Sequence, residues 1–440
     1  MKTIKKYIFK QVAEQKLTKE AAKIMLQEMQ INHENTGNDI AIIGMSARIS
    51  AAETVEQYWD NILQGVNTIR DFPSRRWDDC HSILTANNQE EFCKGGYLNE
   101  IDKFDPYFFN LSLQEAKYMN PLQRLFLETS YQAIEDAGYG GKRIYGTNTG
   151  VYVGVETTSI INYNQLFSQP DPLMFTGSMN GILASRVAFQ FNLSGPSLVV
   201  DTACSSSLTA VILACQALND NQCEMAIAGG LCLTLRPAAK GNVLNMVESE
   251  DGQVKAFDKD ADGTSWGEAV GAILLKSLDQ ALQDGDVIHA VIKGGAINND
   301  GTSNGITAPN AKAQEEVILN AWKNADIDPA TIGYIETHGT GTILGDPIEI
   351  KGITNAFKKV TSLKQFCGIG SVKSNIGHTV GAAGMASLLK VVLMLKHKLI
   401  PQTLNFNQPN QFIDFIASPV YVNDKLLPWP KGMEARRGGG

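Results

Sequence analysis

The pattern of apolar and polar positions changes character near residue 39. Before it, apolar residues recur at helical spacing, as in Ile4, Ile8 and Val12, and predict two short amphipathic helices with Thr18 as N-cap of the second. After it, short runs of consecutive apolar residues alternate with helical patterns, which is typical of strands buried on both faces. The predicted strands are residues 40–44, 150–154, 197–200, 224–230, 271–275, 289–292, 331–335 and 366–370.

Helices are predicted between these strands, at residues 121–137, 205–218, 311–325 and 382–397. Strands that alternate with helices predict an α/β protein whose sheets are covered on both faces. A weak internal similarity suggests two related halves, since a strand, a loop and a small-residue-rich helix surround Cys204 and recur around His378. Halves that face each other would bring these two loops together.

The composition describes a globular chain of 440 residues with 43% hydrophobic residues, 19% charged residues and a net charge of −8. This acidic balance argues against nucleic acid as a partner. The most apolar stretch, residues 382–395, contains Lys390 and is too short to cross a bilayer, so no membrane segment is expected. The seven cysteines lack paired metal-binding spacings, which favours reduced thiols in a cytoplasm and no metal site.

One cysteine lies where a nucleophile is expected. Cys204 follows an apolar strand through Asp201-Thr-Ala and precedes a helix that begins with three serines. A helix N-terminus offers unpaired N–H groups and a positive dipole end, which favour a thiolate. The alternative is a buried capping cysteine. The remaining cysteines with an apolar setting are interpreted as packing residues: Cys215, Cys223, Cys232 and Cys367.

Two of the six histidines lie in glycine-containing loops. His338 begins the segment His338-Gly-Thr-Gly-Thr342, and His378 ends the segment Lys373-Ser-Asn-Ile-Gly-His378. Two imidazoles could place N–H donors at a developing enolate oxygen, which is electrostatic stabilisation more than proton transfer. Glu349 lies eleven positions after His338 and could pair with Lys373 to fix the second loop, although sequence spacing does not establish that contact.

At these motifs the chain resembles the β-ketoacyl synthase family, and specifically the ketosynthase domains of modular polyketide synthases, the trans-acyltransferase type among them. The matching segments are Asp201-Thr-Ala-Cys-Ser-Ser-Ser207, His338-Gly-Thr-Gly-Thr342 with Gly345-Asp-Pro-Ile-Glu349, and Lys373-Ser-Asn-Ile-Gly-His378. The resemblance covers about residues 39–432. It implies a thiolase-like fold, in which two similar halves form a layered α-β-α-β-α arrangement, and a homodimer.

The resemblance also implies a reaction. Cys204 would accept an acyl or polyketide chain from the phosphopantetheine thioester of an acyl carrier protein, with no cofactor bound directly. A malonyl group on a carrier protein, loaded by a separate acyltransferase, would lose CO₂ while His338 and His378 stabilise the enolate. That enolate would attack the Cys204 thioester and give a β-ketoacyl product.

Further residues and partners follow from the same resemblance. Thr340 and Thr342 match the family's pantetheine contacts, and Lys373 with Glu349 matches its supporting ion pair. Residues 1–38 resemble the linker or docking helices that precede such ketosynthases. Neighbouring polyketide synthase polypeptides are therefore expected partners.

We expect an N-terminal segment at residues 1–38, a first half at 39–285, a second half at 286–437 and a tail at 438–440. In the family, the chain continues past this point into a strand and a glycine-rich loop that supplies one N–H of the oxyanion hole. The second half is therefore expected to stop before its last strand. Loss of one oxyanion-hole donor costs about a hundredfold to a thousandfold in rate.

Three functions remain open at this stage. The main hypothesis is a condensing ketosynthase, which the three residues Cys204, His338 and His378 favour. The alternative is a non-condensing docking or gating module, inactive or dependent on a complementing C-terminal piece. A third is a stand-alone enzyme of fatty-acid elongation.

Overall fold

The computed structural model describes residues 12, 17–18, 21–22, 39–77, 92–156, 163–235, 247–303, 305, 307–430 and 435–440. Most of the N-terminal segment predicted to form docking helices lies outside the described residues. Within it, the Thr18 side chain accepts a hydrogen bond from the backbone N–H of Ala21 at 3.1 Å, which is the contact of a helix N-cap.

The first half contains a six-stranded sheet in the order β4-β3-β5-β7-β1-β8. Strands β4, β3 and β5 are parallel to one another, whereas β7 and β1 run antiparallel to their neighbours. In sequence order the strands are β1 (Ile40–Ile49), β3 (Thr149–Val155), β4 (Ser197–Val200), β5 (Met225–Cys232), β7 (Ala269–Ser277) and β8 (Ala290–Ile292).

Strand β1 contributes side chains to two apolar cores, and a bulge changes which positions face each core. Ile42 packs in the cluster of the central helices and Ile43 in the cluster on the opposite face. The pairing with β7 shifts between Ile42 and Gly44. Beyond this extra residue the alternation is reversed, so that Met45 and Ala47 join Ile42 in the central cluster.

The second half contains a four-stranded parallel sheet in the order β12-β10-β9-β14. Its strands are β9 (Ile332–Glu336), β10 (Cys367–Gly370), β12 (Val420–Val422) and β14 (Arg437–Gly439). Two short ribbons complete the strands: β2 (Gly95–Gly96) with β6 (Trp266–Gly267), and β11 (Leu399–Ile400) with β13 (Leu427–Pro428).

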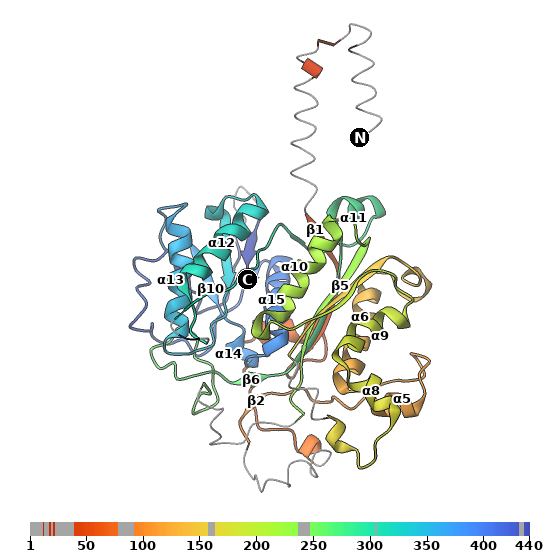
Figure 1. Ribbon diagram of the computed structural model, residues 1–440. Coiled ribbons are helices and arrows are strands. Elements are labelled where there is room, and N and C mark those ends of the chain that lie inside the picture. Colours follow the sequence, from red (N-terminus) through yellow and green to blue (C-terminus); the bar gives the residue numbers. More distant parts are fainter. Residues whose placement is uncertain are drawn as a thin grey trace.

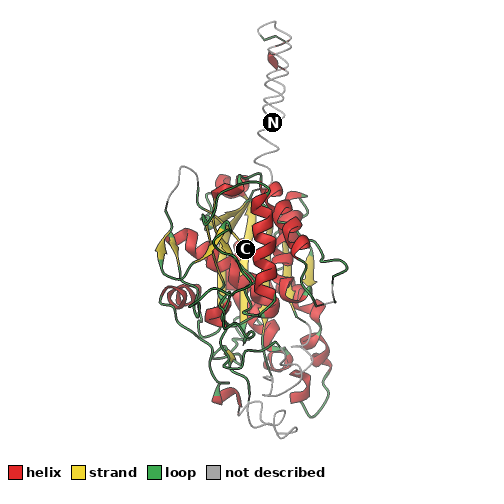
Figure 2. Cartoon of the chain, turned by 90° about the vertical axis from the view of Figure 1, so that its left-hand side faces the viewer, coloured by secondary structure: helices red, strands yellow, loops and turns green. Residues whose placement is uncertain are grey.

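Helices and sheets form five layers (Figures 1 and 2). Helices α6 (Pro121–Asp136) and α9 (Asn180–Gln190) cover the outer face of the first sheet, and α10 (Ser206–Asn219) and α15 (Ala383–His397) lie between the sheets. Helices α12 (Ala311–Ala325) and α13 (Gly345–Lys358) cover the second sheet. Shorter helices are α3 (Val55–Leu63), α5 (Leu113–Tyr118), α8 (Pro172–Ser178), α11 (Leu278–Asp284) and α14 (Lys373–Ile376), with 3₁₀ turns η2 (Gly141–Arg143), η3 (Tyr163–Leu166), η4 (Ala203–Ser205), η6 (Pro329–Thr331) and η7 (Val380–Ala382). The expected α-β-α-β-α arrangement is confirmed.

The most apolar helical segment belongs to the central layer. By length and hydropathy, Val380–His397 is the one described segment that could cross a membrane, but 72% of that window is buried inside the protein. Lys390, within it, is 1% exposed and forms an ion pair in the core. The hydropathy of this segment is therefore explained by its position between two sheets.

Two boundaries of the sequence analysis need correction. Residues 438–440 were expected as a tail, yet Gly438 and Gly439 belong to β14, which pairs with the free edge of β9. Glycine suits this strand because a Cβ atom at Gly438 would lie 2.9 Å from a methyl group of Val391. Residues 290–292, assigned to the second half, form β8 and extend the first sheet by pairing with β1.

Candidate active site

Cys204 lies in a tight turn between β4 and α10. Ala203, directly before it, has a φ of 52°, a left-handed conformation that costs a non-glycine residue about 1 kcal/mol or more. The turn is fixed by Ser206, whose hydroxyl accepts a hydrogen bond from Thr202 N at 2.9 Å and donates one to Ala203 O at 2.7 Å. A strained strand-to-helix turn of this kind presents its central side chain above the sheet.

The second half carries a similar turn ahead of α15. Thr379, Val380 and Gly381 occupy the positions of Thr202, Ala203 and Cys204 relative to the following helix, since η4 precedes α10 as η7 precedes α15. Val380 also has a positive φ, of 37°. The internal similarity seen in the sequence is therefore a repeated backbone turn in which the second copy has glycine in place of the cysteine.

The two turns meet between the sheets. Ser207 at the start of α10 accepts a hydrogen bond from Met385 N at the start of α15, at 3.0 Å. Nε2 of His378 lies 3.1 Å from Sγ of Cys204. The ring of His338 is perpendicular to that of His378, with 5.2 Å between the ring centroids. The structure thus brings together the thiol and both imidazoles.

The hydrogen bonds of His378 indicate its tautomer. Its Nδ1 atom accepts a hydrogen bond from the backbone N–H of Val380 at 3.2 Å, so Nδ1 carries no proton in the neutral ring. Nε2 then carries the proton and points it at Cys204. Burial, together with the nearby charge of Lys373 and with His338, lowers the pKa of His378 well below its usual range. A neutral ring with a fixed N–H donor is the result.

His338 is held through its backbone. The carboxylate of Glu349 accepts hydrogen bonds from the backbone N–H groups of His338 at 2.6 Å and Gly339 at 2.9 Å. The His338 residue is exposed to solvent, yet its protein surroundings and the charge of Lys373 lower its pKa. Contact with water makes this shift smaller than it would be for a sealed ring.

Lys373 is 3% exposed, at the start of α14. The oxygens of Glu349, the predicted ion-pair partner of Lys373, accept backbone hydrogen bonds from the His338 turn, and the Glu349 charge still acts on Lys373. The carboxylates that favour the charged form of Lys373 are Glu336 first, then Glu349 and Asp346, although burial outweighs them and lowers its pKa.

Glu336 connects the segment that carries His338 with the segment that leads to His378. It lies at the end of β9, two residues before His338, and accepts a hydrogen bond from Val372 N at 2.6 Å, next to Lys373. The same carboxylate pairs with Lys390 of α15 at 2.6 Å and accepts the hydroxyl proton of Tyr334 at 2.7 Å. These groups are buried, so the network is a rigid support and not a surface ion pair.

The surroundings of Cys204 do not favour the expected thiolate, because burial raises the pKa of its thiol. Burial raises the pKa of the Cys204 thiol more than the positive charge of Lys373 lowers it, and Glu156 raises it further. Cys204 also lies in η4, ahead of the regular helix α10, so the helix dipole acts from a distance. The N–H of His378 is the group that can stabilise a sulfur anion when it forms.

Thr340 and Thr342 lie on the loop after His338, half-buried, with their hydroxyl oxygens 3.3 Å apart. The loop rests on buried Asp346, whose carboxylate accepts hydrogen bonds from Gly341 N at 3.2 Å and Phe257 N at 2.7 Å. Burial raises the pKa of Asp346 to about 7. Asp346 therefore shapes the loop that carries both threonine hydroxyls.

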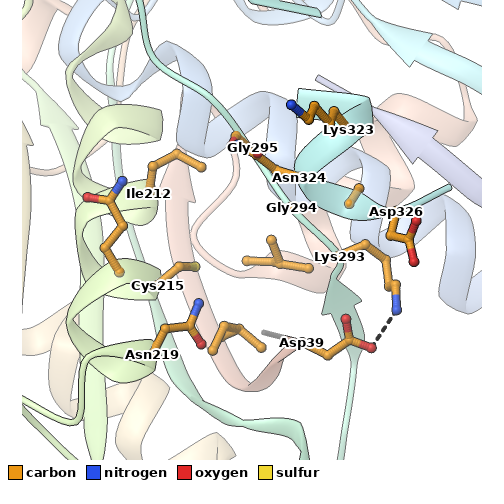
Figure 3. Close-up of a pocket in the computed structure, with 14 residues that line it drawn as sticks. Asp39, Ile212, Cys215, Asn219, Lys293, Gly294, Gly295, Lys323, Asn324 and Asp326 are labelled. Carbon is orange, nitrogen blue, oxygen red and sulfur yellow. Dashed lines mark hydrogen bonds and ion pairs between the residues drawn. The ribbon is translucent and has the colours of Figure 1, made fainter. Parts of the chain in front are cut away.

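The four cysteines that were predicted to be packing residues have buried surroundings. Cys215, Cys223, Cys232 and Cys367 are all buried. Cys215 lines a pocket of about 480 Å³ between α10, β8 and α12, crossed by an ion pair of Lys293 and Asp39 at 2.5 Å (Figure 3). Burial raises the pKa of Cys215 to about 12, and none of the three candidate catalytic residues lines this pocket.

The other histidines have structural surroundings where the structure describes them. His289 lies 2.8 Å from Asp136, and His397 stacks on Trp59. His33 and His81 lie outside the described residues. In the described part of the chain, no group of three His, Cys, Asp or Glu side chains is arranged to hold a metal ion.

Sequence reasoning missed several residues that surround the site. Glu336 lies one position beyond the predicted strand 331–335, and Lys390 lies inside a predicted helix, so their pairing joins positions far apart in the chain. Trp266 was not singled out, although its ring lies against His378 with 5.7 Å between centroids.

Comparison with known proteins gives consistent matches over nearly the whole chain. The family described as "Beta-ketoacyl synthase, N-terminal domain" matches residues 37–281, and "Beta-ketoacyl synthase, C-terminal domain" matches residues 289–407. Polyketide synthase PksL of Bacillus subtilis (strain 168) is 44% identical over 397 residues, which are 89% of this chain and 9% of that protein. Polyketide synthase PksM of the same strain is 45% identical over 399 residues, again 89% and 9%. The chain thus spans less than a tenth of these relatives.

Solved structures show the same relationship. The ketosynthase from module 6 of the bacillaene synthase of Bacillus subtilis 168 is 42% identical, with a TM-score of 0.81, over 91% of this chain and 68% of that one. Ketosynthase twelve from the bacillaene polyketide synthase of Bacillus amyloliquefaciens is 35% identical, with a TM-score of 0.83, over 92% and 72%. These matches confirm the expected thiolase-like fold.

Proposed function

The chain belongs to the β-ketoacyl synthase family, and we propose that it condenses a carrier-bound acyl chain with a malonyl unit as a ketosynthase of a polyketide synthase. The observation that carries this proposal is the 3.1 Å contact between Cys204 Sγ and His378 Nε2, with the His338 ring beside it. The thiol comes from one half and the two imidazoles from the other. The thiol can serve as the nucleophile of thioester exchange, and the imidazoles can stabilise an enolate.

The first step is transthioesterification. The Cys204 sulfur attacks the thioester carbonyl of an acyl chain on the phosphopantetheine arm of a carrier protein. The carrier thiolate leaves with the proton that the Cys204 thiol gives up, and the acyl chain stays on Cys204. The His378 N–H supports the sulfur anion during this exchange, because it is fixed 3.1 Å from Sγ.

The second step forms the carbon–carbon bond. A malonyl thioester, loaded onto a carrier protein by a separate acyltransferase, loses CO₂ and leaves an enolate. The N–H groups of His338 and His378 stabilise the enolate oxygen, and the neutral His378 ring suits a donor that keeps its proton. The enolate carbon attacks the acyl carbonyl on Cys204, the carbon–sulfur bond breaks, and a β-ketoacyl carrier product leaves.

Pantetheine recognition and loop support complete the proposal. Thr340 and Thr342 contact the pantetheine arm, on a loop held by Asp346. Glu349 supports the His338 turn by accepting two backbone hydrogen bonds, and Lys373 supplies positive charge near Cys204. No cofactor other than the carrier's arm is needed for these steps.

Intact mass spectrometry after incubation with an acyl thioester tests the first step. The wild-type chain is expected to gain one acyl adduct, and C204A to gain none. C215A is the matched control, because Cys215 lies outside the site and should leave the adduct unchanged. Equal labelling of wild type and C204A would reject Cys204 as the nucleophile.

Addition of a malonyl carrier protein separates this proposal from the non-condensing alternative. A condensing enzyme loses its acyl adduct and releases CO₂ with a β-ketoacyl product. A docking or gating module keeps the adduct and releases no product.

We also propose a cytoplasmic homodimer that works with carrier proteins and neighbouring polyketide synthase polypeptides. Strand β4 is an edge of its sheet, and it bears Leu198, which is 46% exposed. Phe189 of the adjacent α9 is 83% exposed. L198K is expected to convert a dimer to a monomer in light scattering, whereas K312A on an outer helix should not.

A further inference from the structure

Trp266 lies directly beside His378 because their backbones are bonded. His378 N donates to Ser265 O at 2.6 Å, and Gly267 N donates to His378 O at 3.0 Å. These two hydrogen bonds bracket Trp266 and form an isolated parallel bridge between the two residues. Any displacement of strand β6 would therefore move the His378 backbone.

The ribbon of β2 and β6 presses on the turn before His378. A Cβ atom at Gly267 would lie 2.3 Å from Ile376 O, and one at Gly96 would lie 1.9 Å from the same oxygen. Such a backbone-to-backbone approach leaves the ribbon no room to shift. It provides a rigid base for the Trp266 side chain.

The Trp266 ring lies nearly parallel to the His378 imidazole, with an interplanar angle of 26° and 5.7 Å between centroids. The indole is itself fixed, because its N–H donates to Glu248 Oε1 at 2.5 Å. The other oxygen of Glu248 accepts a hydrogen bond from the Cys93 thiol at 2.9 Å. The indole therefore has one orientation, set by groups outside the catalytic residues.

The imidazole itself has few other restraints on its rotation. Nδ1 has one backbone donor at 3.2 Å, and Nε2 has the Cys204 sulfur. Rotation about the Cα–Cβ and Cβ–Cγ bonds would remove both contacts. The indole lies along one face of the imidazole and restricts its rotation on that side, and His378 is 3% exposed.

We propose that Trp266, held by Glu248, is a positioning residue that fixes the His378 imidazole with its Nε2–H directed at Cys204. This inference deepens the proposed function and rests on it for the catalytic role of His378. The β2–β6 ribbon would then hold Trp266 in place, and Trp266 would orient the His378 imidazole for the reaction.

The charges around His378 define what removal of Trp266 should do. The titratable groups packed around it are Cys204, His338 and Lys373, with Glu336 and Glu349 beside Lys373, Glu156 near Cys204, and Glu248 behind Trp266. Water that replaces the indole would hydrate the imidazolium and raise the pKa of His378. The attraction of an indole face for a cation acts in the opposite direction but is weaker than restored hydration.

The test compares W266A, W266F and E248A with wild type by two measurements. The first is the rate of Cys204 alkylation by iodoacetamide between pH 5.5 and 9, followed on the Cys204 peptide by mass spectrometry. The second is condensation of an acyl chain with malonyl carrier protein. W59F is the matched control, since Trp59 stacks on His397, with 4.8 Å between centroids, outside the site.

The two rates are expected to change in opposite directions. In W266A, an imidazolium beside Sγ stabilises the thiolate, so alkylation at pH 6 rises at least threefold, while condensation falls at least tenfold. E248A shows the same changes to a lesser degree, and W266F retains at least a fifth of the condensation rate. Loss of packing alone would change alkylation by a similar factor at every pH, whereas the effect of an imidazolium is largest near pH 6 and disappears towards pH 9.

Alkylation and condensation rates of W266A within twofold of those of W59F would overturn the inference. If W266A does not fold, E248A and W266F decide it, because both keep a ring at position 266. If wild type is alkylated normally but neither acylated nor able to condense, the proposed function fails. The alkylation profile still decides whether Trp266 positions His378.

Discussion

Nε2 of His378 lies 3.1 Å from Sγ of Cys204, although 174 positions separate the two residues in the chain. Each lies on a turn before one of the two central helices, and the contact crosses from one half of the molecule to the other. The imidazole contributes an N–H and not a basic nitrogen, because its other nitrogen accepts a backbone hydrogen bond. The predictions below follow from this geometry.

H378A is expected to separate the two chemical steps. Loss of one N–H donor to an enolate lowers the condensation rate by about 10²–10³. Acylation of Cys204 should change by less than about tenfold, since no proton is taken by His378 in that step. Rates of acyl adduct formation and of product release measure the two effects. H397A is the control, and equal loss of both steps would contradict a role of His378 that is mainly in enolate stabilisation.

Acid should destabilise the protein through His378. Its pKa is lowered in the folded state, so below about pH 6.5 the unfolded chain binds a proton that the folded chain excludes. The free energy of unfolding therefore rises with pH up to about 6.5. Lowering the pH from 7 to 5.5 reduces it by about 1 kcal/mol. Urea unfolding of H378Q at pH 7 and pH 5.5 should lack the decrease in unfolding free energy that His378 causes.

Asp346 has the opposite effect on the pH dependence of the unfolding free energy. Its pKa is raised to about 7, so its contribution to stability is complete below the unfolded value and is lost as the pH rises towards 7. Because H378Q retains Asp346, the comparison with wild type isolates the histidine. An identical pH dependence for both proteins would contradict the assignment.

K373M is expected to slow the reaction of Cys204 with iodoacetamide near neutral pH. The charge of Lys373 lowers the pKa of this thiol, and its removal leaves burial unopposed. Alkylation should recover at higher pH, where the thiolate forms without help. K312M serves as the control, since the side chain of Lys312 is 82% exposed. Equal rates for both variants would exclude an electrostatic role for Lys373.

The buried pair of Glu336 and Lys390 should show strong coupling. K390M leaves the Glu336 carboxylate without its cation and is expected to cost about 3–5 kcal/mol of unfolding free energy. E336Q in the same chain removes the uncompensated charge, so the double variant should be more stable than K390M alone. Denaturant unfolding of the four proteins measures this coupling, and additive losses would argue against it.

The conformation of Ala203 predicts a gain of stability on a change to glycine. With φ at 52°, A203G should stabilise the protein by up to about 1 kcal/mol, whereas A203V should destabilise it and slow Cys204 acylation. A210G, in the interior of α10, is the control with the opposite sign, since glycine there costs about 1 kcal/mol. Loss of stability in both glycine variants would contradict the strain at Ala203.

Much of the fold could be predicted because buried strands and amphipathic helices have strong local patterns. Strand β4 and helix α12 have the predicted bounds, and the predicted helices 121–137 and 382–397 differ from α6 and α15 by one residue. Strand β14 was missed because three glycines near the end of the chain have no apolar pattern. This strand forms by pairing with the edge of β9, and the sequence of residues 437–439 alone does not predict that pairing.

The site was predicted in part, for a similar reason. Cys204, His338 and His378 were found from their loops, and the contact between Cys204 and His378 follows from the repeated turn. The Lys373–Glu349 ion pair stays a prediction: the Glu349 carboxylate accepts two backbone N–H groups, and its charge also acts on Lys373. Trp266 was missed because its role arises from a backbone bridge to His378, and sequence spacing does not encode such a bridge.

The glycine at position 381, where the second turn matches the cysteine of the first, has a further consequence. A Cβ atom there would lie 2.9 Å from the backbone nitrogen of Glu156 and 3.0 Å from Leu231 O. The second half therefore cannot acquire a nucleophile of its own without forcing apart the strands beside it. The backbone of the first half thus restricts position 381 to glycine, which leaves the Cys204 turn as the place for the thiol.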